Sequence, residues 1–125
     1  MTSELGQHDT HSLSILRIYL RHPRGRRRSL WKRLVGRPLA HELAERALEV
    51  GVTCASVSQG HAGFAPGAKH VAAALSDVPP PGLPTCLELV APRALLDTFV
   101  HDNAADLQGA VLVRVDGTWL RLGAA

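Results

Sequence analysis

The order in which apolar segments alternate along this chain limits the folds that it can adopt. Four short runs are rich in Leu, Val and Ile and are bounded by Gly, Pro or polar residues, which is the pattern of β-strands. The first run is apolar on both faces, as expected of a central strand that is covered on both sides. These runs lie at residues 13–20, 52–59, 83–90 and 111–115.

Two of the segments between these runs have the apolar spacing of amphipathic helices. The first opens at Pro38, which suits the first helical turn, and stops before Gly51, which suits the position after the C-cap. The second opens at Pro92 and stops at Gly109. A β-α-β-β-α-β order with right-handed crossovers predicts an α+β, ferredoxin-like fold, in which both helices cover one face of a four-stranded antiparallel sheet.

The other face of this sheet must also be covered. The outward residues of the strands at 13–20 and 52–57 are too apolar to remain in water. We therefore expect subunits to pack sheet to sheet and the chain to form a homo-oligomer.

The length of 125 residues fits one domain. Residues 1–12 lack periodicity and predict a disordered arm, so the domain should span 13–122. Asp116-Gly117 predicts a hairpin turn into a short last strand at 118–122. No run approaches the roughly 18 apolar residues of a membrane span, and the polar start is unlike a signal peptide. We expect a cytoplasmic protein.

Positive charge is concentrated in one interval. Nine of the 14 Lys and Arg residues lie between Arg17 and Arg37 with no acid among them, whereas the rest of the chain has five bases and 11 acids. The interval at about 21–36 is longer than a usual strand-to-helix loop and predicts a basic insertion. This insertion is either a solvated loop or a surface that binds nucleic acid or an anionic membrane. The aromatic residue among the bases suits the second alternative, because it can stack on a nucleic-acid base or lie at a membrane surface. The candidate polyanion-binding residues are Arg24, Arg26, Arg27, Arg28, Trp31, Lys32 and Arg33.

A glycine-punctuated loop follows the second predicted strand. Gly60, Gly63 and Gly67 permit positive φ and close approach of backbone N–H groups to an anion, and Lys69 and His70 follow them. Such a loop can cradle a phosphate, but glycines after a strand are also ordinary turn residues.

Catalytic and metal-binding motifs are missing from the sequence. The seven histidines include no H-x-x-x-H or H-E-x-x-H pair, and no G-x-S-x-G, G-x-G-x-x-G or Walker-type sequence occurs. His61 and His70 are the best-placed metal candidates. Cys54 and Cys86 fall inside predicted strands, where we expect reduced thiols that pack as small hydrophobes rather than a zinc site or a disulfide. We expect neither an enzyme nor a metalloprotein.

Several short motifs resemble the DUF190 family of PII-like proteins, over about residues 13–115 and most specifically from Gly36 to Leu75. The motifs are Gly36-Arg-Pro-Leu39, Ala47-x-x-x-Gly51, Ala55-Ser-Val-Ser-Gln-Gly-His-Ala-Gly-Phe64 and Lys69-His70. The sequence departs from the family in its basic insertion, in Ala65-Pro66 after the phenylalanine, and in the proline-rich entry to the third strand.

The resemblance implies a non-enzymatic signalling protein that forms a homotrimer and binds a small anionic effector, such as a nucleotide, in clefts between subunits. Gly60, Gly63 and Gly67 would then supply backbone donors, and Phe64 a hydrophobic wall. Lys69, with His70 beside it, and Arg114 on the last strand would neutralise phosphate. No bound cofactor beyond such an effector is implied, and the partner could be a membrane transporter.

Overall fold

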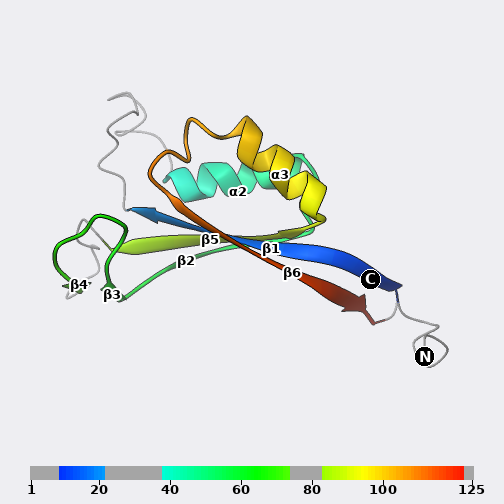
Figure 1. The fold of residues 1–125 in the computed structure, drawn as a ribbon, viewed down its shortest axis with the longest axis horizontal. Helices are drawn as coiled ribbons and strands as arrows, with labels where there is room; N and C mark the ends of the chain where they lie inside the picture. The colour runs from blue at the N-terminus through cyan, green and yellow to red at the C-terminus, as the bar shows by residue number, and fades with distance from the viewer. Residues whose placement is uncertain (1–8, 22–37, 74–82, 123–125) are drawn as a thin grey trace.

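The computed structural model describes residues 9–21, 38–73 and 83–122, and these form a four-stranded sheet with two helices on it and a separate two-stranded sheet. Both helices lie on the same face of the sheet, and a small hairpin stands at one end of it (Figure 1). In chain order the elements are β1 (Asp9–Arg21), α2 (Leu39–Glu49), β2 (Cys54–Gln59), β3 (Ala62–Gly63), β4 (Ala72–Ala73), β5 (Pro84–Ala91), α3 (Arg93–Asp102) and β6 (Val111–Arg121).

The main sheet has four strands in the order β2-β5-β1-β6, and every neighbouring pair is antiparallel. The central position of β1 agrees with its apolar residues on both faces. This strand order and the one-sided helix layer confirm the predicted ferredoxin-like α+β fold.

Both helices begin at the predicted prolines. Pro38 and Pro92 are the N-cap residues, and each carbonyl accepts a hydrogen bond from a backbone N–H one turn later. Helix α2 ends as predicted, with Gly51 at a φ of +89°. Helix α3 ends at Asp102, well before the predicted end at Gly109. Asn103 Nδ2 donates a hydrogen bond to the Phe99 carbonyl oxygen at 2.8 Å, and turns follow this residue.

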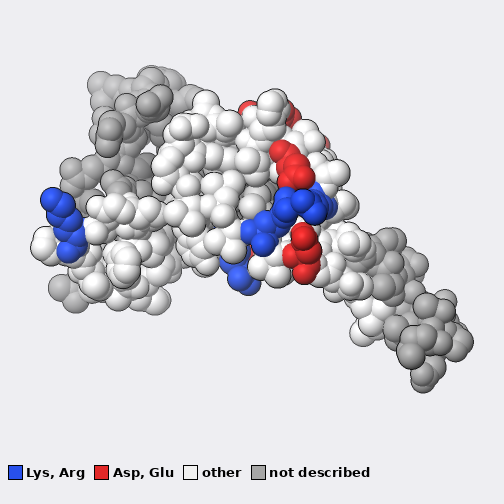
Figure 2. All heavy atoms as spheres, in the orientation of Figure 1, with Lys and Arg blue, Asp and Glu red and all other residues white. Residues whose placement is uncertain are grey.

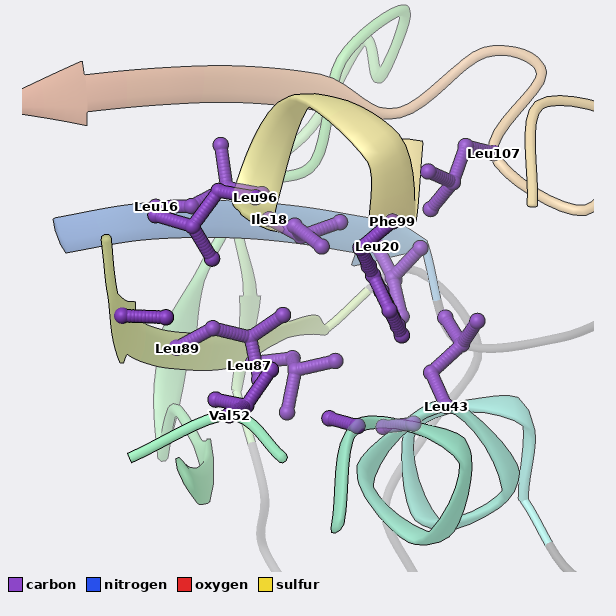
Figure 3. Packing of buried hydrophobic residues seen from close by; sticks show 13 residues of the cluster. Leu16, Ile18, Leu20, Leu43, Val52, Leu87, Leu89, Leu96, Phe99 and Leu107 are labelled. Carbon is purple, nitrogen blue, oxygen red and sulfur yellow. The ribbon is translucent and has the colours of Figure 1, made fainter. Parts of the chain in front are cut away.

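The core lies between the helices and one face of the sheet (Figure 3). Alternate residues of β1 and β5 point to this face, as the pleat requires. Helix α2 presents a narrow apolar stripe to them, and α3 contributes the aromatic ring of Phe99. The buried residues of these elements include Leu16, Ile18, Leu20, Leu43, Ala47, Leu87, Leu89, Ala91, Leu96 and Phe99.

The end of the chain differs from the prediction. Strand β6 continues through Asp116-Gly117, where we expected a turn, and β1 begins at Asp9 rather than Leu13. The cause is long-range pairing, since residues 9–13 of β1 lie opposite residues 117–121 of β6 and supply hydrogen-bond partners. A tight hairpin turn of the expected type needs positive φ, and the φ of Gly117 is not positive.

The second face of the sheet, opposite the helices, is not covered by any described element (Figure 1). Cross-strand register arranges twelve of its side chains in three rows of four, because antiparallel partners share a face. We call this set the open sheet face. Its rows are Cys54, Val90, Ile15 and Val115; Ser56, Glu88, Arg17 and Val113; and Ser58, Cys86, Tyr19 and Val111.

The two cysteines lie on the open sheet face as free thiols. Our expectation that both pack as buried hydrophobes is wrong for Cys54, which is exposed because β2 is an edge strand. Cys86 is half-buried, and that burial raises the pKa of its thiol. Register sets Cys54 opposite Val90 and Cys86 opposite Ser58, so the two are not cross-strand partners.

Candidate effector-binding loop

The predicted glycine loop forms a small structure of its own beside the main sheet. Strands β3 and β4 pair as a two-stranded hairpin, with Gly63 opposite Ala72. The hairpin lies at the opposite end of the molecule from the start of β1 and the end of β6 (Figure 1). Its base is fixed by a hydrogen bond from the Gly60 N–H to the Pro84 carbonyl oxygen, at 3.2 Å. The loop therefore leaves β2 and is held beside the start of β5.

Two of the three loop glycines have the positive φ that the sequence suggested. Gly63 has a φ of +148° and Gly67 a φ of +84°, whereas the φ of Gly60 is not positive. Gly67 is the third residue of a turn closed by a hydrogen bond from the Ala68 N–H to the Ala65 carbonyl oxygen, at 3.1 Å. Proline followed by a left-handed glycine fits a type II turn, so Ala65-Pro66 has a local structural explanation.

Side chains of the loop are mostly directed to solvent. Ala65 is buried, but 65% of Phe64 and 69% of Val71 are exposed. Lys69 and His70 are exposed as well, and among the described residues Lys69 has no hydrogen bond or ion pair. The loop thus combines positive-φ glycine backbone, exposed apolar surface and an unengaged cation, which together suit an anion with an apolar part.

Arg114, the remaining ligand candidate, lies far from this loop in the sheet. It belongs to β6 at one edge, whereas the loop follows β2 at the other edge, with β5 and β1 between them. Its guanidinium contacts Asp97 at 2.8 Å and Asp116 at 3.6 Å. Figure 2 shows acidic and basic side chains gathered around this part of the surface. Within one chain, the structure does not bring Arg114 together with Lys69 and His70.

Asp116 is held in this cluster from the β1 side. The buried Ser14 hydroxyl donates to its carboxylate, and this bond, together with the charge of Arg114, holds the pKa of Asp116 below its usual range. A depressed carboxyl pKa favours the folded state above the unfolded pKa, and this contribution is lost as pH falls through the folded value. The cluster thus ties β6 to β1 and α3.

The remaining candidates lie outside the site or outside the described residues. The predicted polyanion-binding residues from Arg24 to Arg33 all fall within 22–37, which the structure does not describe. In the described ranges, no three His, Cys, Asp or Glu side chains gather as a metal site would require, and His61 is exposed like His70. None of the described helices has the length and apolar character to cross a membrane.

A shallow groove between the C-terminal half of α2 and α3 was not anticipated from the sequence. It has a volume of about 230 Å³ and includes Arg46, Val50 and Phe99 in its lining. Arg46 crosses it to bond Asn103 at 2.7 Å and Asp106 at 2.8 Å. Leu48 of α2 is 77% exposed although it is apolar, but it does not line the groove, so no sequence signal indicates this groove.

Comparison with solved structures finds the same arrangement of strands and helices. CPII from Thiomonas intermedia K12, a nitrogen regulatory PII-like protein, matches in its apo form with a TM-score of 0.52 and 14% identity, over 92% of this chain and 99% of that one. CPII bound to ADP, AMP and bicarbonate matches with a TM-score of 0.55 and 16% identity, over 90% of this chain and 92% of that one. The chain has the PII-like fold. A candidate PII-like signalling protein from Thermus thermophilus also matches, with a TM-score of 0.50 and 11% identity, over 91% of this chain and 93% of that one.

These comparisons establish the PII-like fold alone. No family model matches the chain, and no curated protein matches it. The resemblance to the DUF190 family therefore stays a prediction. ADP, AMP and bicarbonate are ligands of CPII.

Proposed function

We propose that this chain is a PII-like regulatory protein that binds a small anionic effector, with an adenine nucleotide as the first candidate, and that it performs no catalysis. The observation that carries the proposal is the loop after β2, where left-handed Gly63 and Gly67 stand beside exposed Phe64 and unengaged Lys69. A nucleotide has phosphates that can accept hydrogen bonds from the backbone N–H groups of the loop and pair with the Lys69 ammonium. Its base can stack on the exposed ring of Phe64. The nucleotide-bound CPII structures, which share the fold, support this choice.

The separation of Arg114 from the loop supports a site between subunits. The two lie at opposite edges of one sheet. In a closed ring of identical copies, each contact joins two different surfaces of the chain, so a contact can join the β6 side of one copy to the loop side of the next. A homotrimer built in this way sets Arg114 of one copy near the loop of its neighbour, which a single chain does not do.

The open sheet face supports self-association. Val111, Val113 and Val115 are each more than 40% exposed, in a row along β6. A contiguous apolar surface of this kind on a soluble protein marks an interaction site. We propose that the sheet faces of three copies meet there.

A thermal-shift experiment tests the effector proposal. ADP, AMP and bicarbonate are added separately to the full chain in excess of any expected dissociation constant. A ligand at 100 times its Kd stabilises the folded state by about 2.7 kcal/mol, which corresponds to a rise in Tm of several degrees for a domain of this size. We expect this rise with ADP or AMP, and a Lys69→Ala variant should show a smaller one. An unchanged Tm with all three ligands contradicts the proposal.

A second candidate function is binding of nucleic acid or an anionic membrane through the basic insertion, and the nine bases between Arg17 and Arg37, with no acid among them, favour it. Replacement of Arg26, Arg27, Arg28 and Arg33 with Ser should leave the melting temperature unchanged, because we expect these charges on a solvated loop, where they contribute little to stability. It should weaken binding to DNA, RNA or anionic vesicles and reduce the slope of log K against log salt by about 0.7–0.9 for each phosphate that is no longer neutralised. If the wild-type chain binds none of these at about 50 mM salt, where screening is weak, this candidate is excluded.

A further inference from the structure

The groove between α2 and α3 belongs to the helix layer, on the opposite side of the sheet from the open sheet face (Figure 1). Its walls are the C-terminal half of α2, which precedes the start of β2, and α3, whereas the glycine loop follows the end of β2. Val50, Leu95 and Phe99 contribute apolar lining, and Val50 is 50% exposed. The groove is therefore an apolar surface separate from both the effector loop and the proposed contact between copies.

Two carboxylates stand in this groove without an opposite charge. Glu49 belongs to α2 and Asp102 to α3, so each helix contributes one, and both residues are exposed. Within the described ranges, neither takes part in a hydrogen bond or an ion pair. Arg46 also lines the groove, but it is already engaged by Asp106 at 2.8 Å and by Glu42 at 3.8 Å. The groove thus presents uncompensated negative charge beside apolar surface.

This combination of charge and shape restricts what the groove can bind. Its carboxylates repel phosphate, so it suits neither a second nucleotide nor nucleic acid nor an anionic membrane. Its volume of about 230 Å³ lies below the roughly 300–1,000 Å³ of sites that enclose a whole small molecule. An apolar side chain of a peptide fits such a space. A lysine or arginine beside it can lay its aliphatic stem on the apolar surface and direct its charge to a carboxylate.

We propose that this groove is the docking site of a partner protein, which inserts an apolar side chain between α2 and α3 and pairs flanking lysine or arginine residues with Glu49 and Asp102. Apolar grooves between helices recognise peptide segments in this way, and the charges select the partner. The proposal goes beyond the effector site. Copies that meet through the open sheet face leave the helix layer uncovered, so the groove stays accessible in the proposed assembly (Figure 1).

Titration with a synthetic peptide tests the proposal. The probe is Gly-Lys-Arg-Leu-Lys-Arg-Gly, added to the full chain and measured by calorimetry. We expect a Kd of about 10–100 μM, because the peptide offers one apolar side chain and a few exposed charge pairs. The affinity should fall as salt is raised. A peptide with glutamate in place of the four bases, or with glycine in place of leucine, should bind at least about tenfold more weakly.

Variants of the chain locate the binding site. Glu49→Gln/Asp102→Asn should weaken peptide binding about three- to tenfold, since two exposed charge pairs are removed. Val50→Ser should also weaken it, through lost apolar lining. The matched control is Gln108→Lys/Thr118→Lys, which changes net charge equally at two exposed positions outside the lining and should alter the Kd by about twofold or less. Circular dichroism establishes that each variant is folded.

Three results would overturn the docking site. The first is a wild-type chain that binds no peptide up to about 1 mM. The second is an equal loss of affinity in the control variant, which means that the peptide responds to net charge alone. The third is binding only after Arg26, Arg27, Arg28 and Arg33 are replaced with Ser, which means that the chain's own basic insertion competes for the groove.

The same variants separate this proposal from the effector proposal. ADP affinity should be equal in Glu49→Gln/Asp102→Asn and the wild type, because neither carboxylate belongs to the glycine loop. Failure of ADP to bind therefore leaves the docking site standing, and failure of the peptide to bind leaves the effector site standing. A marked change of ADP affinity in this variant would contradict the separation of the two sites.

Discussion

Replacement of Gly63 with valine is expected to abolish ADP binding while the protein stays folded. Gly63 has a φ of +148°, which is unfavourable for valine, so β3 must change its backbone course to accept the side chain. A Cβ at this position would lie 3.5 Å from the Pro84 Cγ atom, an ordinary contact, so backbone strain rather than a clash is the cause. The strain should lower the free energy of unfolding by about 1–3 kcal/mol.

Gly109→Val is the matched control for this change. Gly109 has a φ of +82° and nothing within 4 Å of an added Cβ, so valine there suffers comparable strain in a turn before β6. We expect a similar loss of stability with ADP affinity retained, measured by calorimetry on both variants. Equal ADP affinity in Gly63→Val and the wild type would mean that the loop is a turn without a binding role.

Leu87→Ala is expected to lower the free energy of unfolding by about 2–5 kcal/mol, the largest stability effect of the changes considered. Leu87 is fully buried on β5 between the sheet and the helices, and it is the cross-strand partner of Ile18 on one side and Val57 on the other (Figure 3). Its truncation removes apolar contacts and leaves a cavity that a close-packed core fills only in part.

Leu48→Ala, the same substitution on the outer side of α2, is the control for Leu87→Ala. Leu48 is mostly exposed, so the change should alter stability by less than about 0.5 kcal/mol. Urea unfolding at one protein concentration compares the variants, because self-association adds to apparent stability. A loss at Leu48 as large as that at Leu87 would contradict the assignment of the core to the inner face of the sheet.

The sequence predicts the fold where the signals are local. The prolines at residues 38 and 92, Gly51 and the apolar spacing of the two helices place these elements correctly, and strand order follows from crossover handedness. The course of β6 through Gly117 depends instead on pairing with residues 9–13, more than a hundred positions earlier, which no local pattern encodes. The exposure of Leu48 and Cys54 likewise depends on where α2 and β2 end relative to their neighbours.

The candidate site also combines features that local sequence indicates with features that depend on tertiary structure. Glycine permits the positive φ that Gly63 and Gly67 adopt, because few other residues adopt that backbone, but the sequence does not distinguish them from Gly60, whose φ is not positive. The place of Arg114 does not follow from its position in the sequence, since its distance from the loop and its pairing with Asp97 depend on the complete sheet and on α3. Assembly is a further step. On the second sheet face β6 carries valines, but β2 carries Cys54, Ser56 and Ser58 where we expected apolar residues, and neither set says how copies are arranged.

Calorimetric titration of ADP into the assembled wild-type chain tests the central claim most directly. We expect saturable binding with equal numbers of nucleotides and subunits, competition by AMP, and loss of the signal in Gly63→Val. Titration to about 1 mM detects even a weak interaction of roughly −4 kcal/mol. No saturable binding of ADP or AMP up to that concentration, by a protein shown to be folded and assembled, would contradict the proposal that this PII-like fold binds an adenine nucleotide.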